Sequence, residues 1–279
     1  MRKAFWVGLC AILCLPMLLP LLLLLTGSLM GQDEAVKALG PVFSGADGYA
    51  HWPLLPQYPT LKGHIELMLD SPEFFAMFWN SASYAFVSLT AQAVVGGGAA
   101  WAFAQYRFPM KKPLFTAYIA LMLMPFQVTM VGQYLSLDSF QLIDTRLAII
   151  LPLAFSTVPV FIMTKFFEAV PSSMLEAARI DGAGEWHIFL QIGLPLGVPG
   201  LLSAMALGFI EAWGMIEQPM TFLRSQRLWP LALYLPQITG ESMGRALSAS
   251  AITLIPPLLV FLCGQRYLEQ GIGTMGIKE

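Results

Sequence analysis

Residues 171–195 read PSSMLEAARIDGAGEWHIFLQIGLP, and this polar stretch interrupts a chain that is otherwise strongly apolar. Its titratable residues are Glu176, Arg179, Asp181, Glu185 and His187. Hydrophobic residues make up 57% of the 279 residues and charged residues only 11%, against roughly 25% in soluble domains. The net charge of −2 gives no electrostatic case for binding nucleic acid. The composition predicts an integral membrane protein, in which this polar stretch needs a separate explanation.

Six apolar runs are candidates for membrane-spanning helices, which need about 20 mostly apolar residues each. They lie near 4–29, 75–105, 114–134, 148–163, 194–216 and 247–264. Pro125 breaks the third run, and such prolines are tolerated where neighbouring helices satisfy the freed carbonyl groups. The first run is longer than the 7–15 apolar residues typical of a cleaved signal peptide, so we expect a retained helix. The sequence therefore predicts an all-α protein with six transmembrane helices.

The polar segments set the expected domain organisation and orientation. Residues 31–73 are rich in Gly and Pro, which predicts an ordered loop of turns rather than helices or strands. With the N-terminus inside, nine Lys and Arg residues lie on the inner segments and six on the outer ones, which favours cytoplasmic termini. The resulting division is a first membrane helix at 1–30, an extracytoplasmic loop at 31–73, a membrane core at 74–268 containing 171–195, and a cytoplasmic tail at 269–279.

The polar stretch has the signals of a short helix. Ser173 and Glu176 have the spacing of a capping box, with Ser173 expected at the N-cap. The helix is expected to end before Gly182, since glycine accepts the left-handed conformation that closes a helix. A helix of this length is not stable alone and must pack against something.

Two further elements are expected after this stop. Residues 185–192 have the pattern of a second short helix, and Leu194-Pro195 is expected to turn the chain back into the membrane. Links between helices usually run 2–8 residues, and this one is about three times longer. The length favours a docking element, and the alternative is a surface loop that only connects two spans.

The motif residues resemble a known family. Glu176-Ala177-Ala178, Gly182 and Ile192-Gly193-Leu194-Pro195 match the pattern EAA-x3-G-x9-I-x-L-P of ATP-binding-cassette (ABC) importer permeases. Asp181, Ala183 and Phe189 make the stretch similar to the MalG-like subunits of maltose-type carbohydrate transporters. Further matches include the residues around Phe78-Trp79-Asn80-Ser81, and the resemblance covers about residues 75–279.

The resemblance implies a type I ABC importer permease fold whose EAA loop is a cytoplasmic coupling helix. It implies a bacterial cytoplasmic-membrane protein whose partners are a second, MalF-like permease subunit, two ATPase subunits, an extracytoplasmic solute-binding protein and membrane lipid. The ATPase-coupling residues that it implies are Glu176, Ala177, Ala178, Asp181, Gly182, Ala183, Ile192, Leu194 and Pro195. Of these, Glu176 would contact the ATPase, Ala177 and Ala178 would allow close seating, and Gly182 would form the bend.

The segment after the fifth run departs from the family pattern. Many relatives read approximately SWNDF there, whereas this chain has Glu211, Trp213 and Glu217. These three are candidates for lining the pathway or contacting a partner subunit. An ionisable residue in a membrane segment is a functional candidate, and Glu211 has three open roles. They are a pathway or subunit contact, proton coupling, and a carboxyl group that reaches water near the outer interface.

The sequence gives no sign of an enzyme. Gly96-Gly97-Gly98 and Gly182-Ala183-Gly184 lack the Lys-Ser/Thr of a phosphate-binding loop, so we expect no cofactor on this chain and ATP with Mg on the ATPase partners. The predicted function is ATP-driven import of a sugar or a related solute, with glycerol phosphates as an open alternative. The competing classes are an ion-coupled secondary transporter and a membrane protein that serves only in assembly.

Overall fold

The computed structural model describes residues 2–43, 49, 51, 53–234 and 242–275, and all regular elements in that part of the chain are helical. The helices of the first half are α1 (Arg2–Gly27), α2 (Gln32–Phe43), α3 (Lys62–Asp70), α4 (Pro72–Ala91), the π-helix η1 (Gln92–Gly96), α5 (Gly97–Gln105), α6 (Lys111–Leu123) and α7 (Phe126–Ser139). Those of the second half are α8 (Leu147–Ala154), α9 (Thr157–Glu168), α10 (Ser172–Ile180), α11 (Glu185–Ile188), the π-helix η2 (Phe189–Gly193), α12 (Leu194–Gly214), α13 (Glu217–Phe222), the short 3₁₀ turns η3 (Gln226–Leu228) and η4 (Leu231–Leu233), and α14 (Met243–Met275). The predicted all-α class is confirmed.

Four helical segments are long and apolar enough to cross a membrane. They are Pro72–Gln105, Leu147–Glu168, Glu185–Gly214 and Met243–Glu269, and they correspond to the second, fourth, fifth and sixth predicted runs. The third run is the pair α6 and α7, whose axes meet at 109° across the predicted break at Pro125. In α1 the described apolar stretch is Leu13–Gly27. The described residues thus hold four spans, or five if the bent pair is one, and the count of six stays a prediction.

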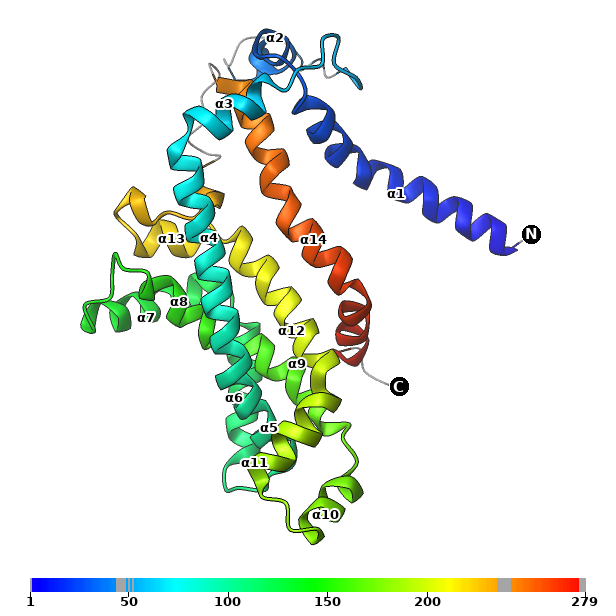
Figure 1. Ribbon diagram of the computed structural model, residues 1–279, viewed down its shortest axis with the longest axis vertical. Coiled ribbons are helices and arrows are strands. Elements are labelled where there is room, and N and C mark those ends of the chain that lie inside the picture. Colours follow the sequence, from blue (N-terminus) through cyan, green and yellow to red (C-terminus); the bar gives the residue numbers. More distant parts are fainter. Residues whose placement is uncertain (1, 44–48, 50, 52, 235–241, 276–279) are drawn as a thin grey trace. The chain divides into compact units, whose positions relative to one another are not determined.

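The chain divides into two compact units, and the first comprises residues 1–77 and 233–256. Within it, the segment predicted as turns contains α2 and α3, so that reading was wrong (Figure 1). Ala35 and Leu39 of α2 are buried against Met30, Met243 and Leu247, at a spacing that places them on one helix face. Burial of this small apolar face offsets the helix-breaking tendency of Gly40 and Pro41 near the end of α2.

The second unit, residues 78–232 and 257–279, is built around α5, α9 and α12. Figure 1 shows α9 and α12 running side by side. Their close approach depends on Gly197 of α12, because a Cβ there would overlap the ring of Phe167. Phe167 in turn packs edge-on against Trp101 of α5, with ring centroids 5.3 Å apart. This tight aromatic core lies beneath α10 and positions it.

Candidate functional site

The helix α10 begins two residues earlier than predicted, at Ser172. Pro171 is its N-cap residue, with φ −62° and ψ 126°, and no side chain caps the helix. The main-chain N–H of Met174 donates to the Pro171 carbonyl at 3.2 Å. The expected capping box at Ser173 was therefore wrong. Proline already has the extended backbone that an N-cap residue requires, which places Ser173 inside the first turn.

The end of α10 is the glycine stop that the sequence predicted. Gly182 has φ +84°, and Asp181 precedes it as the C-cap. The N–H of Ala183 donates to the carbonyl of Ala178 at 3.0 Å, and that of Gly182 donates to Arg179 at 3.1 Å. These two bonds form a Schellman motif, which fixes the direction in which the chain leaves the helix.

Leu175 anchors α10, with Ala178 packed against the same cluster, while the opposite face is free. Leu175 is only 2% exposed and belongs to the core cluster that contains Phe167 and Ile188. Glu176 and Ala177 are exposed, and Ile180 is 86% exposed. The helix therefore presents a mixed apolar and acidic surface away from the rest of its unit.

An ion pair closes the turn that follows α10. Arg179 Nε donates to Glu185 Oε1 at 2.7 Å, and a terminal guanidinium nitrogen donates to Oε2 at 3.2 Å. The hydroxyl of Tyr106, the residue after α5, donates to the same Oε2 at 3.0 Å. Partial burial, the largest cause, raises the pKa of Tyr106 and keeps its phenol protonated as a donor. Three separate elements thus meet at the Glu185 carboxylate.

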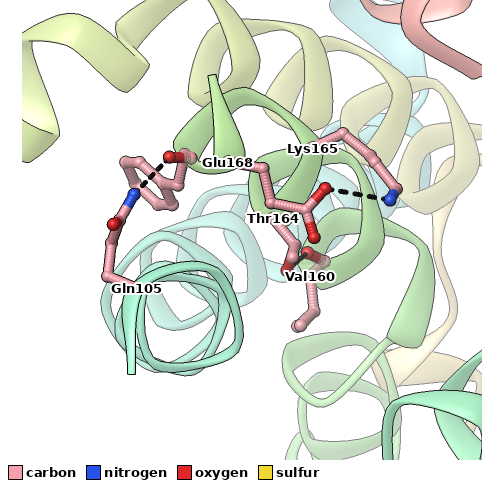
Figure 2. Close-up of polar contacts among 6 residues, drawn as sticks. Gln105, Val160, Thr164, Lys165 and Glu168 are labelled. Atoms are coloured by element: carbon pink, nitrogen blue, oxygen red, sulfur yellow. Dashed lines mark hydrogen bonds and ion pairs between the residues drawn. The ribbon is translucent and has the colours of Figure 1, made fainter. Parts of the chain in front are cut away.

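A second contact ties the ends of α5 and α9 together beneath α10. The side-chain amide of Gln105 donates to the carbonyl of Phe167 at 2.6 Å (Figure 2). The hydroxyl group of Thr164 donates to the main-chain carbonyl of Val160 at 2.7 Å. The ammonium group of Lys165 forms an ion pair with the carboxylate of Glu168 at 3.0 Å. The last turn of α9, which leads directly into α10, is thereby held in place.

The remaining motif residues lie on one continuous helical segment, 185–214, rather than at a turn. The expected reversal at Leu194-Pro195 was wrong, since α11, η2 and α12 follow one another without a break. The π-helical bonds of η2 just before Pro195 accommodate a residue that lacks an N–H. Ile192 and Leu194 are half-buried, while Pro195 is exposed. The helix that enters the membrane therefore starts within the motif itself.

Tyr106, Gln105 and Glu185 were missed by the sequence analysis as members of this site. The available signal was the polar pair Gln105-Tyr106 at the end of an apolar run, followed by a basic loop. The spacing of 79 residues between Tyr106 and Glu185 gave no indication that the two side chains meet.

The three residues singled out after the fifth run do not form one group. Trp213 is buried, with its ring 5.5 Å from both Phe78 and Phe209. Glu211 and Glu217 are exposed and line a hollow of about 330 Å³. Its other lining residues include Phe126, Leu153, Gly214 and Gln218.

Comparison with known proteins agrees with this architecture. The chain is 34% identical to a probable ABC transporter permease protein of Pyrococcus horikoshii over 82% of this chain and 85% of that protein. It is 27% identical to the arabinooligosaccharides transport system permease protein AraQ of Halalkalibacterium halodurans, over 80% and 81% of the two chains. A crystal structure of a bacterial ABC transporter involved in the import of the acidic polysaccharide alginate matches with a TM-score of 0.78 at 20% identity, over 95% and 96% of the two chains.

The family itself follows from a match that covers more than half of the chain. Residues 92–274 match the family described as binding-protein-dependent transport system inner membrane component. This stretch contains α10 and the ion pair that closes its turn, together with the three packed helices of the second unit. The chain belongs to this family of membrane permease subunits of binding-protein-dependent importers.

Proposed function

We propose that this chain is one of two permease subunits of an ATP-driven saccharide importer, and that α10 is the element on which a separate ATPase subunit acts. The arabinooligosaccharide and alginate transporters to which it is similar both carry saccharides, which supports this solute class. The absence of a phosphate-binding loop from the sequence supports ATP binding by another chain.

The observation that carries the proposal is the free outer face of α10. This nine-residue helix buries Leu175 and leaves Met174 and Ile180 exposed beside the carboxylate of Glu176. Exposed apolar side chains grouped with a charge are typical of a protein-binding surface. Glu176 would pair with a basic group of the ATPase, and the small side chain of Ala177 would permit close contact.

The geometry also provides a route for mechanical work. The links from Glu185 to Tyr106 and from Gln105 to Phe167 connect α10 to the ends of α5 and α9. The close contact between Phe167 of α9 and Gly197 of α12 adds α12 to the same packed group of helices. A push on α10 would therefore move packed helices together, because a close-packed interior shifts as a unit and does not deform locally.

The orientation and the partners of the chain belong to the same proposal. The face that carries α10 lies in the cytoplasm with both termini, and the 31–73 segment faces the solute-binding protein outside. The second permease subunit completes the pathway, and lipid surrounds the spans. This chain binds no cofactor, while ATP and Mg belong to the two ATPase subunits.

A charge reversal on α10 tests the proposal. In the complex of both permeases, the ATPase and the solute-binding protein, Glu176→Lys should lower ATP hydrolysis stimulated by the binding protein at least tenfold. The permease pair should still copurify, because Glu176 makes no core contact. Asp138→Lys reverses an exposed acid on α7 and serves as the control. Stimulated hydrolysis that is equal in Glu176→Lys and the wild type would refute the coupling role.

A further inference from the structure

The hollow beside Glu211 lies where three helical elements end or break. Phe126 starts α7 after the 109° bend, Leu153 lies in the last turn of α8, and Gly214 ends α12. The helices α7, α8 and α13 gather on this side of the second unit (Figure 1). Each of the three discontinuities contributes a residue to the lining of the hollow.

The position of Leu153 places the hollow at membrane depth. It lies within the apolar segment Leu147–Glu168, about 9 Å from its start at 1.5 Å per residue. The break at Phe155 and Ser156 follows directly. Non-helical backbone at such a depth is tolerated only where it is buried in protein or lines a water-filled cavity. The hollow is open and carries two exposed carboxylates, which favours a recess that admits water.

The polar lining is rich in hydrogen-bond acceptors. Gln127 donates from its amide nitrogen to both carboxylate oxygens of Glu217, at 2.7 and 2.8 Å, and holds them in place. The amide oxygen of Gln218 is buried and has no hydrogen-bond partner. Glu211 adds a second carboxylate, and the described lining contains no Lys or Arg. The two exposed carboxylates can accept from the hydroxyl groups of a saccharide, and Phe126 adds an apolar side chain to the lining.

We propose that this recess receives the hydroxyl groups of a neutral saccharide in transit and rejects acidic saccharides and sugar phosphates. Two carboxylates without a nearby cation repel an anion, and the repulsion is stronger in a partly desolvated recess than in bulk water. The inference rests on the proposed function, because it assumes that the second unit borders the solute pathway. It narrows the solute class to uncharged sugars.

Thiol labelling tests the charge selectivity without any assumption about the solute. Gly214→Cys places a thiol in the recess, where an added Cβ has no neighbour within 4 Å. Gly132→Cys on α7 is the matched control, because it has equal space and does not line the recess. Both are made in the assembled complex after Cys10, Cys14 and Cys263 are replaced by Ser, and both are treated with a cationic and an anionic methanethiosulfonate.

The cation-to-anion ratio of labelling rates should be at least tenfold higher at position 214 than at position 132. Adding Glu211→Gln and Glu217→Gln should bring the two ratios together, because these changes keep the shape and remove the charge. Equal ratios at the two positions without these changes would overturn the inference. Copurification of the subunits confirms that each variant is assembled.

A transport assay separates this inference from the proposed function. Proteoliposomes that hold the complete complex are given arabinotriose or a uronic-acid trisaccharide, each with the solute-binding protein. We expect ATP-dependent uptake of the neutral trisaccharide to exceed that of the acidic one at least tenfold. Uptake that favours the acidic trisaccharide would overturn the inference and leave the proposed function intact. Failure of ATP to drive uptake of either trisaccharide, with no stimulated hydrolysis, would overturn both.

Discussion

The guanidinium of Arg179 and the carboxylate of Glu185 are joined by two hydrogen bonds, 2.7 and 3.2 Å long, across the glycine turn that ends α10. A paired guanidinium and carboxylate fix orientation as well as distance. The pair therefore sets the angle between α10 and the helical segment 185–214 that continues into the membrane. Tyr106 binds the same carboxylate and extends the connection to α5.

Reversing the charge of Arg179 should uncouple the transporter without unfolding it. The pair is about half exposed, so its loss should change the free energy of unfolding by less than about 1 kcal/mol. We expect Arg179→Glu to raise the ATP hydrolysed per saccharide imported at least threefold. The double variant Arg179→Glu, Glu185→Arg should recover most of the coupling, since it restores the pair. A double variant no better than the single one would show that the pair does not transmit the motion.

Gly182 should tolerate substitution much less well than Gly184, although both have open space around them. Gly182 has φ +84°, where an L-residue costs roughly 1–2 kcal/mol, whereas Gly184 has φ −71°. We predict that Gly182→Val speeds amide hydrogen exchange across α10 about tenfold, while Gly184→Ala leaves it unchanged. Gly182→Asn should fall between the two, because Asn visits this conformation more readily. Similar exchange in the Gly182 and Gly184 variants would contradict the prediction.

Gly197 should be sensitive to substitution because there is no space for a larger side chain, and not because of its backbone conformation. An alanine Cβ there would overlap the buried ring of Phe167, and overpacking of this kind typically costs about 1–3 kcal/mol. Gly197→Ala should lower the midpoint of thermal unfolding of the detergent-solubilised complex. Gly132→Ala, which meets no neighbour, should leave the midpoint unchanged or raise it, because alanine favours helices. If both variants raise the midpoint, the close approach of α9 and α12 is not as described.

The first unit should lose stability at mildly acidic pH through His64. Its ring nitrogen Nδ1 lies 3.2 Å from the hydroxyl of Ser248, and burial lowers the pKa of His64 below its usual value of 6.5. The unfolded state therefore binds a proton more readily than the folded state, and the stabilisation present above pH 6.5 is lost as pH falls below it.

Hydrogen exchange of α3, corrected for the intrinsic rate, should accordingly be faster at pH 5.5 than at pH 7.5. His64→Gln should remove this difference, while His51→Gln, at an exposed position, should retain it. An equal pH response in the wild type and His64→Gln would rule out His64 as the titrating group.

Local signals predicted the parts of the structure that depend on local chemistry. The long apolar runs became helices, Pro125 marked the bend between α6 and α7, and Gly182 took the left-handed conformation. The errors arose where tertiary packing outweighs local preference. Residues 35 and 39 form a helix because they are buried against α14, and the helix through Pro195 continues because η2 adjusts its hydrogen bonds.

Contacts between residues far apart in the sequence could not be predicted from one chain. How the helices cross determines that Tyr106 meets Glu185. It also determines that Phe126, Glu211 and Gln218 line one hollow. Periodicity assigns a residue to a helix face but does not say which other helix that face meets. The motif located the proposed coupling helix, while the structure added the residues that hold it.

Chemical crosslinking at Ala177 tests the central claim that α10 is the ATPase contact. In the complete complex with the native cysteines of this chain replaced, Ala177→Cys should capture the ATPase subunit in high yield through a short reagent that joins a thiol to a lysine amine. Ser136→Cys, an exposed position on α7, should capture none of it. If Ala177→Cys failed to capture the ATPase in a complex that hydrolyses ATP, or if only Ser136→Cys captured it, the coupling role of α10 would be contradicted.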